Sequence, residues 1–319
     1  TVKDMSLTAL FKITDQAKFS KDGETVYLAA WTTTPWTLLG NLALCVGAEI
    51  EYSQIRIDQN TAIIIATDRL AAYSDVLPKD AEGKPQYTVE NTYQGSDLVD
   101  TGYEAPWNYY PSEKKGWYVV AEPFVTTTDG TGIVHIALYG EDDYQVIQKY
   151  DLPRLQHVNK EGKFIDGSGV YSGRYFKEEG LDVEILKDLA SRNMLLKKEK
   201  YEHNYPHCWR CKTPLIYFAI SSWFIRMSQL RDELIKNNQE INWHPEHIKE
   251  GRFGNWLSEI KDWALSRNRY WGTPLPVWEC NSCHKTLCVG SMIELQKKSG
   301  QELPINDQGE RDLHRPYID

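Results

Sequence analysis

The sequence WTTTPWTLLGN, residues 31–41, places three adjacent threonines between an apolar run and a proline. The apolar run, VYLAA at residues 26–30, is rich in β-forming residues and predicts a buried strand. Pro35 disfavours a helical conformation at Thr34 but fits the first turn of a helix, which makes Thr34 a candidate N-cap. We therefore predict a strand that turns sharply into a short helix from Pro35 to Leu39, closed by the glycine that follows.

The threonines at this junction allow two interpretations. In an extended strand successive side chains alternate, so Thr32 and Thr34 would point one way and Thr33 the other. A strand-to-helix junction also leaves backbone N–H groups without partners, and together with the hydroxyls these suit the binding of a carbonyl or an oxyanion. The alternative is that β-branched threonines simply fill the end of a strand. The residues alone leave both interpretations open.

A second group of candidate residues lies in DGTGIVHIALYGEDDY, residues 129–144. His135 falls on a predicted strand, and Glu141, Asp142 and Asp143 fall in the first turn of a predicted helix, where the helix dipole favours ionised carboxylates. A carboxylate beside that histidine could hold an ammonium group. The alternative is that the acidic residues only cap the helix and that His135 is structural.

The surrounding sequence predicts a β-rich body with a few helices. Short runs of β-forming residues are bounded by Gly, Asp and Asn, and no repeated strand–helix–strand pattern occurs. The dipeptide Asp129-Gly130 between two such runs predicts a hairpin. The predicted strands are residues 26–31, 42–46, 52–57, 62–66, 87–93, 117–125 and 132–137, and the predicted helices are residues 68–77, 141–150, 177–194 and 228–236.

Composition limits the possible functions. The chain has 319 residues and a formal charge of −9, which suggests about two domains and argues against a general nucleic-acid-binding surface, though not against contact with one strand end. No run of about 18 apolar residues occurs that could span a membrane. Neither a Gly-x-Ser-x-Gly elbow nor a phosphate-binding glycine loop is present. The N-terminus has no initiator methionine and no signal pattern, so we expect a piece of a larger protein.

Four of the six cysteines form two Cys-x-x-Cys pairs, Cys208 with Cys211 and Cys280 with Cys283. In a large chain with few other cysteines, such pairs indicate zinc in a reducing compartment rather than disulfides. From spacing alone, the four thiols predict one four-sulfur zinc site.

Several blocks of the sequence, taken together, resemble one family. They cover essentially the whole chain and resemble the isoleucyl-tRNA synthetases. The valyl and leucyl relatives carry an arginine after the paired threonines, where this chain has Thr34 followed by Pro35, so the isoleucyl family is preferred. The blocks are WTTTPWTL followed by Gly40-Asn41, GTGIVH, GEDDY, YPHCWRCKTPLIY, SSWF, NWHPEHI, GRFGNWL, SRNRYWGTPLPVW and DLHRPYID.

The resemblance implies an α+β fold: a β-barrel-like editing domain with flanking helices in residues 1–200. A smaller mixed zinc-ribbon and connecting region in residues 201–319 would return to a Rossmann-type class I catalytic domain. Such an editing domain hydrolyses valine wrongly esterified to the isoleucine tRNA. Editing is needed because one methylene is worth only about 1–3 kcal/mol in a hydrophobic pocket, a magnitude for which this same family is the standard example. The HIGH-type and KMSKS-type motifs of aminoacylation are absent from this sequence, so ATP, Mg²⁺, isoleucine and valine would be ligands of the full-length enzyme only.

The resemblance also implies roles for individual residues. The threonines would hold the ester carbonyl and an attacking water, without a protein nucleophile, and an aspartate would bind the α-ammonium of the amino acid. A histidine would narrow the pocket against isoleucine, while a tryptophan and an asparagine would line the pocket and its adenosine side. The implied catalytic residues are Thr32, Thr33, Thr34 and Asp143, and the implied substrate-binding residues are Trp36, Asn41 and His135.

One departure from the family pattern concerns the loop after His135. The family usually reads H-x-A-P-x-aromatic-G there, whereas this chain reads HIALYG, which is one residue shorter and lacks the proline. Counting back from the glycine selects Asp143, counting from His135 selects Tyr144, and Asp142 is a further alternative. We select Asp143, because a tyrosine cannot hold an ammonium group as a carboxylate does.

For the cysteines, the resemblance implies that each pair is half of a separate zinc site. Cysteines outside residues 1–319 would complete both sites, with His284 or Cys288 as substitutes within this chain. The implied partner is the 3′ end of tRNA(Ile), and we expect a cytoplasmic monomer. The alternative function is a non-catalytic zinc-ribbon and tRNA-docking fragment whose editing pocket is disabled by the shorter loop.

Overall fold

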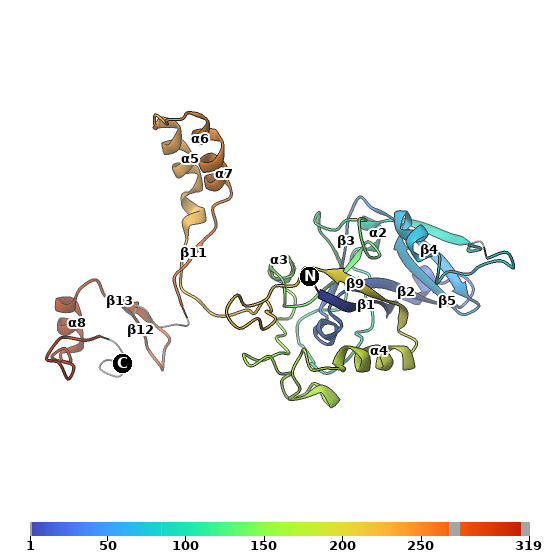
Figure 1. The fold of residues 1–319 in the computed structure, drawn as a ribbon, viewed down its shortest axis with the longest axis horizontal. Coiled ribbons are helices and arrows are strands. Elements are labelled where there is room, and N and C mark those ends of the chain that lie inside the picture. Colours follow the sequence, from blue (N-terminus) through green and yellow to red (C-terminus); the bar gives the residue numbers. More distant parts are fainter. Residues whose placement is uncertain (1, 84, 268–274, 314–319) are drawn as a thin grey trace. The chain divides into compact units, whose positions relative to one another are not determined.

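The chain folds into two units. The computed structural model describes residues 2–83, 85–267 and 275–313 (Figure 1). Its units are Thr1–Ala219 and Ile220–Asp319. The predicted division near residue 200 falls inside the last strand of the first unit, which pairs with the first strand as far as His203. Parts of the blocks SRNRYWGTPLPVW and DLHRPYID lie outside the described residues.

Within the described part of the first unit, nine strands form one sheet, with the order β6-β4-β5-β2-β8-β3-β7 and with β1 pairing both β2 and β9. The pairs β2–β5, β2–β8 and β3–β7 are parallel and the others antiparallel. The strands are β1 (Val2–Lys12), β2 (Thr25–Thr32), β3 (Ala43–Val46), β4 (Glu51–Asp58), β5 (Thr61–Ala66), β6 (Val89–Gln94), β7 (Val119–Ala121), β8 (Ile133–Ile136) and β9 (Leu195–His203).

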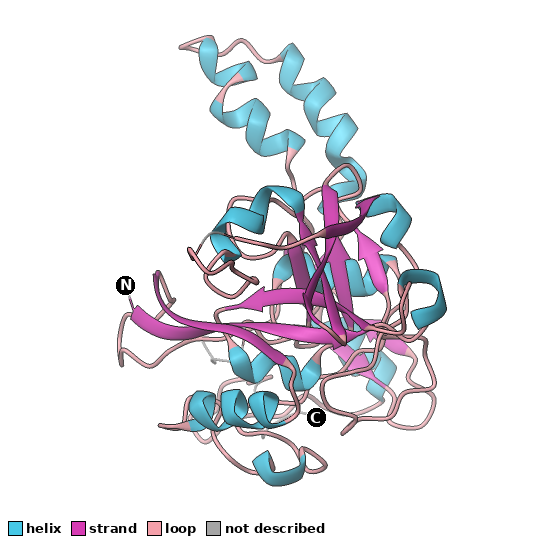
Figure 2. Ribbon diagram, turned by 90° about the vertical axis from the view of Figure 1, so that its right-hand side faces the viewer, coloured by secondary structure: helices cyan, strands magenta, loops and turns pink. Residues whose placement is uncertain are grey.

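The sheet is curled rather than flat. Figure 2 shows the long strand that begins near the N-terminus lying across the direction of the other strands. Short helices lie around this sheet, and the α+β expectation is confirmed as a mixed α/β unit with a curled sheet. The helices of this unit are α1 (Gln16–Phe19), η1 (Pro35–Gly40), η2 (Thr67–Tyr73), α2 (Gly95–Leu98), α3 (Glu141–Lys149), η3 (Gly169–Tyr171) and α4 (Leu181–Ser191), where η marks a 3₁₀-helix.

The predicted hairpin around Asp129-Gly130 is wrong. The strands on either side of it, β7 and β8, are not neighbours, because β3 lies between them and pairs with both. All four residues of β3 are buried, so this short apolar strand gains more from a central position than from an edge. The turn therefore connects two strands across the width of a third.

The pairing of β1 with β9 was not predicted from the sequence. These strands join the two ends of the first unit, from Val2 opposite His203 to Ala9 opposite Leu195. The β9 sequence LLKKEKYEH is mostly charged, and its residues alternate only partly between half-buried and exposed. A strand with so little hydrophobic periodicity cannot be recognised from its sequence. Its extended conformation depends on the backbone hydrogen bonds that it makes with β1.

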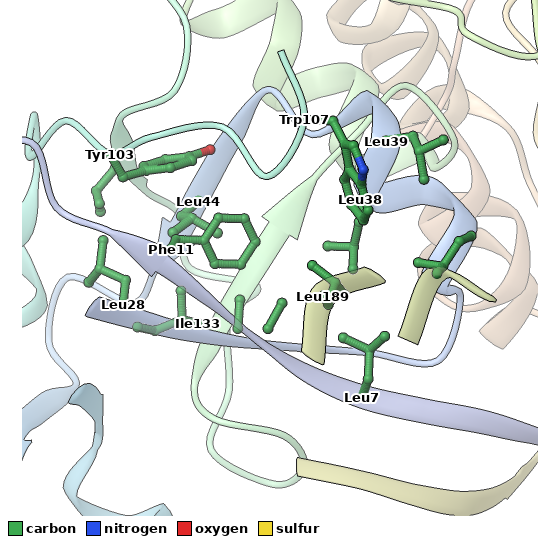
Figure 3. Packing of buried hydrophobic residues seen from close by; sticks show 14 of the residues in the cluster. Leu7, Phe11, Leu28, Leu38, Leu39, Leu44, Tyr103, Trp107, Ile133 and Leu189 are labelled. Atoms are coloured by element: carbon green, nitrogen blue, oxygen red, sulfur yellow. The ribbon is translucent and has the colours of Figure 1, made fainter. Parts of the chain in front are cut away.

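The main hydrophobic core lies on one face of the sheet, between the strands, η1 and α4. Figure 3 shows Leu44, Phe11, Leu28 and other residues of this cluster. The opposite face is covered separately, because Cys45, Val120, Ile136, Val146 and other residues form a second cluster beneath α3. The strands that carry the candidate residues are therefore packed on both faces, which gives the site a rigid support.

The second unit contains small strands and helices, and its helix α7 contacts both α5 and α6. A small apolar cluster of Val289, Leu295 and Leu303 lies near its last helix. Across the ranges that the structure describes, no helix is both long and apolar enough to cross a membrane. Its elements are β10 (Phe224–Ile225), η4 (Met227–Leu230), α5 (Arg231–Glu240), α6 (His247–Glu250), α7 (Arg252–Ser258), β11 (Trp263–Ala264), β12 (Val277–Glu279), β13 (Thr286–Cys288) and α8 (Met292–Ser299).

Candidate functional site

The strand-to-helix turn predicted at the threonines is confirmed. Strand β2 ends at Thr32, and the 3₁₀-helix η1 runs from Pro35 to Gly40 with proline in its first turn. Thr34 occupies the N-cap position, but its side chain makes no capping hydrogen bond. Instead its carbonyl accepts the N–H of Thr37 at 3.0 Å. The hydroxyl of Thr34 is therefore available for side-chain contacts.

Three threonine hydroxyls form a connected chain of hydrogen bonds. The hydroxyl oxygen of Thr32 accepts the N–H of Thr34 at 3.1 Å and lies 3.2 Å from the Thr34 hydroxyl. The Thr34 hydroxyl lies 3.3 Å from that of Thr37. Thr37 in turn donates to the carbonyl of Thr34 at 2.8 Å and lies 2.9 Å from Nε2 of His135. These hydrogen bonds thus link the threonine turn to strand β8, on which His135 lies.

The hydrogen bonds assign the protonation of His135. Since the Thr37 hydroxyl gives its proton to the Thr34 carbonyl, it accepts from His135, so we assign the proton of this imidazole to Nε2. Nδ1 then carries a lone pair, and it is buried with no hydrogen-bond partner in the described part of the chain. Burial lowers the pKa of His135 to about 4, so the ring is neutral at pH 7. The site therefore contains a buried acceptor to which no described residue donates.

Asp143 lies in the first turn of α3, next to the loop that leaves β8. Its side chain folds back over Gly140, where a Cβ would overlap the carboxylate. The backbone of Ala137 acts on the pKa of this carboxyl in the lowering direction, but two other effects outweigh it. Burial, followed by repulsion from Asp142, raises the pKa of Asp143 to about 7. A partly buried carboxylate with a raised pKa is a candidate for a functional role, because a cation placed beside it would favour its ionised form.

The three alternatives from the sequence differ in their surroundings. Asp142 is exposed, whereas Asp143 is partly buried. The hydroxyl of Tyr144 accepts a hydrogen bond from Gln148 at 2.8 Å. No hydrogen bond among the described residues joins Asp143 to the threonines or to His135. Selecting Asp143 as the ammonium-binding residue remains a prediction.

The remaining predicted residues lie beside the hydroxyl chain in different environments. Thr33 is partly buried between the two ends of the turn. Trp36 is buried, and its indole N–H has no hydrogen-bond partner within the described ranges. The amide of Asn41 is used within the protein, since it donates to the carbonyl of Ala43 at 3.1 Å and accepts from the hydroxyl of Tyr103 at 2.7 Å. The roles of Trp36 and Asn41 at the substrate stay predictions.

Thr37 and His157 were not predicted from the sequence. Thr37 follows Thr34 by three residues, and on a helix this spacing places two side chains next to each other, so the predicted helix could have indicated it. His157 is fully buried, and one ring nitrogen lies 3.2 Å from the carbonyl of Trp36. No local sequence pattern indicates His157, because its hydrogen-bond partner, the carbonyl of Trp36, lies far away in the sequence.

The two cysteine pairs form the same kind of turn. In the first pair the carbonyl of Cys208 accepts the N–H of Lys212 at 2.9 Å, and Lys212 has a φ of 60°. In the second the carbonyl of Cys280 accepts the N–H of His284 at 2.9 Å, and His284 has a φ of 54°. The two Cys-x-x-Cys pairs therefore share one backbone geometry, that of a tight turn.

The thiols of these turns have an environment that suits metal binding. Hydrogen bonds from Thr213, first from its side chain, lower the pKa of Cys211 to about 7. Backbone N–H groups, first that of Cys283, lower the pKa of Cys280. A thiolate is the form that binds zinc. Each pair therefore fits half of a zinc site, and the residues that the structure describes contain no cluster of three or more metal-binding side chains.

Comparison with known proteins places the chain in a family. Residues 10–315 match the family model described as tRNA synthetases class I (I, L, M and V). The chain is 44% identical to isoleucine–tRNA ligase of Clostridium novyi (strain NT), over 100% of this chain and 28% of that protein. It is 42% identical to isoleucine–tRNA ligase of Bacillus thuringiensis (strain Al Hakam), over 100% of this chain and 29% of that protein.

The chain thus spans less than a third of the length of these curated relatives. Among solved structures, GlLeuRS-CP1 gives a TM-score of 0.48 at 16% sequence identity, covering 61% of this chain and 99% of that one. Because the family model covers nearly the whole chain, the protein belongs to the class I tRNA synthetases (I, L, M and V), and the relatives named here are isoleucine–tRNA ligases.

Proposed function

We propose that this chain is the editing part of an isoleucyl-tRNA synthetase and that it hydrolyses the ester of valine wrongly attached to tRNA(Ile). The main support for this proposal is the series of hydrogen bonds that runs from Thr32 through Thr34 and Thr37 to His135. At its end, Nδ1 of His135 is buried, and no described residue donates a hydrogen bond to it. A buried acceptor of this kind is satisfied when a ligand or a water supplies a donor. Aminoacylation itself would belong to the full-length enzyme, together with ATP and Mg²⁺.

The threonines would act by positioning and polarisation. Hydroxyl groups held at fixed places can bind an ester carbonyl and an attacking water without reorganising during the reaction. The bond between the valyl carbonyl carbon and the ribose oxygen breaks, water supplies the new hydroxyl group, and its second proton goes to the ribose oxygen. No side chain is needed as a nucleophile. The rate gain comes from the fixed geometry of Thr32, Thr33 and Thr34.

Asp143 and His135 would recognise different parts of the amino acid. Asp143, once ionised, provides the negative charge for the α-ammonium, and this cation offsets the cost of burying the carboxylate. His135 stays neutral because burial lowers its pKa to about 4, so it narrows the pocket without repelling the ammonium. Valine fits and isoleucine, with one more methylene, does not.

Enlarging the pocket at His135 is expected to remove the discrimination against isoleucine. The wild-type chain should hydrolyse valyl-tRNA(Ile) and leave isoleucyl-tRNA(Ile) intact, whereas His135→Ala should hydrolyse both. Excluding one methylene corresponds to about a 10- to 200-fold difference in kcat/KM, which the variant should lose. The measurement is deacylation of the two charged tRNAs side by side, at matched enzyme and tRNA concentrations.

Glu161→Gln provides a control for these measurements, because Glu161 is an exposed residue of the same unit outside the candidate site and should keep the wild-type selectivity. If the wild-type chain hydrolyses neither ester, the proposed function is wrong. If it hydrolyses both equally, the assignment of His135 as a size filter is wrong.

The cysteine turns support a second proposal, that Cys208 with Cys211 and Cys280 with Cys283 each supply two thiolate ligands to a zinc site. Zinc there would hold the turn together and would take no part in hydrolysis. We expect Zn²⁺ to slow alkylation of these four thiols several-fold, as followed by peptide mapping with mass spectrometry. Alkylation of the same thiols with Mg²⁺ in place of Zn²⁺ is the control, because Mg²⁺ prefers oxygen ligands and should not protect them. Equal alkylation rates with and without Zn²⁺ would contradict the assignment and would also weaken the alternative of a zinc-ribbon fragment.

A further inference from the structure

Two residues in contact, the partly buried Tyr139 and the fully buried His157, join the two segments that carry the candidate residues. Tyr139 lies in the loop between β8 and α3, and its hydroxyl lies 3.2 Å from Nδ1 of His157. Nε2 of His157 lies 3.2 Å from the carbonyl of Trp36 in η1. The threonine turn and the loop that leads from His135 to Asp143 are therefore connected through a single imidazole.

The direction of each hydrogen bond in this pair follows from its neighbours. The Tyr139 hydroxyl accepts the backbone N–H of Val158 at 2.9 Å, so its own proton is free to be donated to Nδ1 of His157. His157 then carries its proton on Nε2 and donates it to the carbonyl of Trp36. Burial lowers the pKa of His157 to about 4, which keeps this neutral arrangement intact near pH 7.

Packing leaves this imidazole little room to move. His157 is fully buried, and its ring stacks on Phe164 with 5.7 Å between the ring centroids. A Cβ on Gly40 would overlap the ring. The ring of Tyr139 packs edge-on against Trp36 with 4.8 Å between the centroids. Both the hydrogen bonds and the ring contacts thus fix the distance between η1 and the loop.

We propose that Tyr139 and His157 are positioning residues that hold the threonine turn and the His135–Asp143 loop in register for ester hydrolysis. The inference rests on the proposed function, since the reaction it serves is deacylation. Neither residue touches the substrate in this proposal. Their effect is transmitted through the backbone of Trp36, next to Thr37, and through the loop that follows strand β8, on which His135 lies. A displacement of about 1 Å between two halves of a site can lower a rate by about 10²-fold.

The test compares Tyr139→Phe with a matched control, Tyr73→Phe. Tyr73 is a buried tyrosine in a different apolar cluster of the same unit, and its hydroxyl forms a hydrogen bond with that of Thr8 at 2.9 Å. Both variants remove one hydrogen-bonded hydroxyl, so both should lose some stability. Only Tyr139→Phe should lower kcat for valyl-tRNA(Ile), by about 10- to 100-fold with KM little changed, and should also reduce the ratio of valine to isoleucine hydrolysis.

A second measurement does not depend on activity. The ¹⁵N chemical shifts of the His135 imidazole should change in Tyr139→Phe and stay at wild-type values in Tyr73→Phe. His157→Gln, which can still donate to the carbonyl of Trp36 but loses the contact with Tyr139, should change them in the same way and serves if Tyr139→Phe does not fold. Unchanged His135 signals in the folded variants would overturn the inference, as would equal losses of kcat in Tyr139→Phe and Tyr73→Phe. If the wild-type chain does not deacylate, the proposed function fails, and the NMR comparison still decides the positioning role.

Discussion

Replacing Asp143 by Asn is expected to abolish deacylation and at the same time to stabilise the protein at pH 8. The carboxylate is partly buried, and burial and Asp142 raise its pKa from 3.8 to about 7. Asn has nearly the same size and shape as Asp but carries no charge. The variant thus loses the partner of the α-ammonium, and it also loses the free energy penalty of a buried anion.

The sign of the stability effect follows from the two pKa values. The unfolded carboxyl ionises near pH 4 and the folded one near pH 7, so ionisation destabilises the fold increasingly between these values and by a constant amount above pH 7. A difference of about three pH units corresponds to about 4 kcal/mol, as an upper figure. Relative to wild type, Asp143→Asn should gain nothing below pH 4 and most above pH 7, as measured by urea unfolding across this range.

The activity of the same variant should fall steeply. Removing one partner of a desolvated charge pair costs about 2–5 kcal/mol, which corresponds to a loss of about 30-fold to several thousand-fold in kcat/KM. In the wild type, kcat/KM should decline about tenfold per pH unit below pH 7, as the carboxylate becomes protonated. Asp143→Ala should be inactive as well, with the fold retained.

Asp142→Asn is the control for this prediction. Asp142 is exposed, and its charge contributes to the raised pKa of Asp143. Its replacement should keep deacylation and move the pH dependence to lower pH. Wild-type turnover in Asp143→Asn would refute the selection of this aspartate from the shortened loop.

The largest loss of stability is expected from Leu44→Ala. Leu44 is fully buried in the main core, with Phe11 and Leu28 (Figure 3), and it lies opposite His135 in the pairing of β3 with β8. Truncation removes three carbon atoms and leaves a cavity that neighbouring strands, packed on both faces, cannot fill. Such changes destabilise by about 2–5 kcal/mol. Urea unfolding of the first unit, followed by tryptophan fluorescence and circular dichroism, gives the measurement.

Leu295→Ala is the matched control for that experiment. Leu295 is buried in the small cluster of the second unit, so its truncation should leave the unfolding of the first unit unchanged. A loss below about 1 kcal/mol for Leu44→Ala would mean that the core collapses around the cavity, and the rigid support inferred for His135 would then be wrong.

Local elements of the site could be predicted from the sequence because neighbouring residues determine them. Pro35 limits the backbone on both sides of itself, so the end of β2 and the start of η1 follow from a few residues. The first turn of α3 likewise follows from its glycine and acidic residues. The resemblance to isoleucyl-tRNA synthetases also came from the sequence, because it rests on long blocks of matching residues.

The connections between these elements were decided by the tertiary structure. Spacing in the sequence does not show that β3 separates β7 from β8, that β9 pairs with β1, or that His157 lies between Gly40 and Tyr139. These contacts join residues far apart in the chain, and their stability depends on burying surface that several elements contribute together. The sequence alone therefore determined where the threonines turn and which family carries them. The tertiary structure decided that Thr37 and His135 extend their hydrogen bonds and that a buried imidazole fixes the loop beside them, because only packing brings these distant groups within hydrogen-bonding distance.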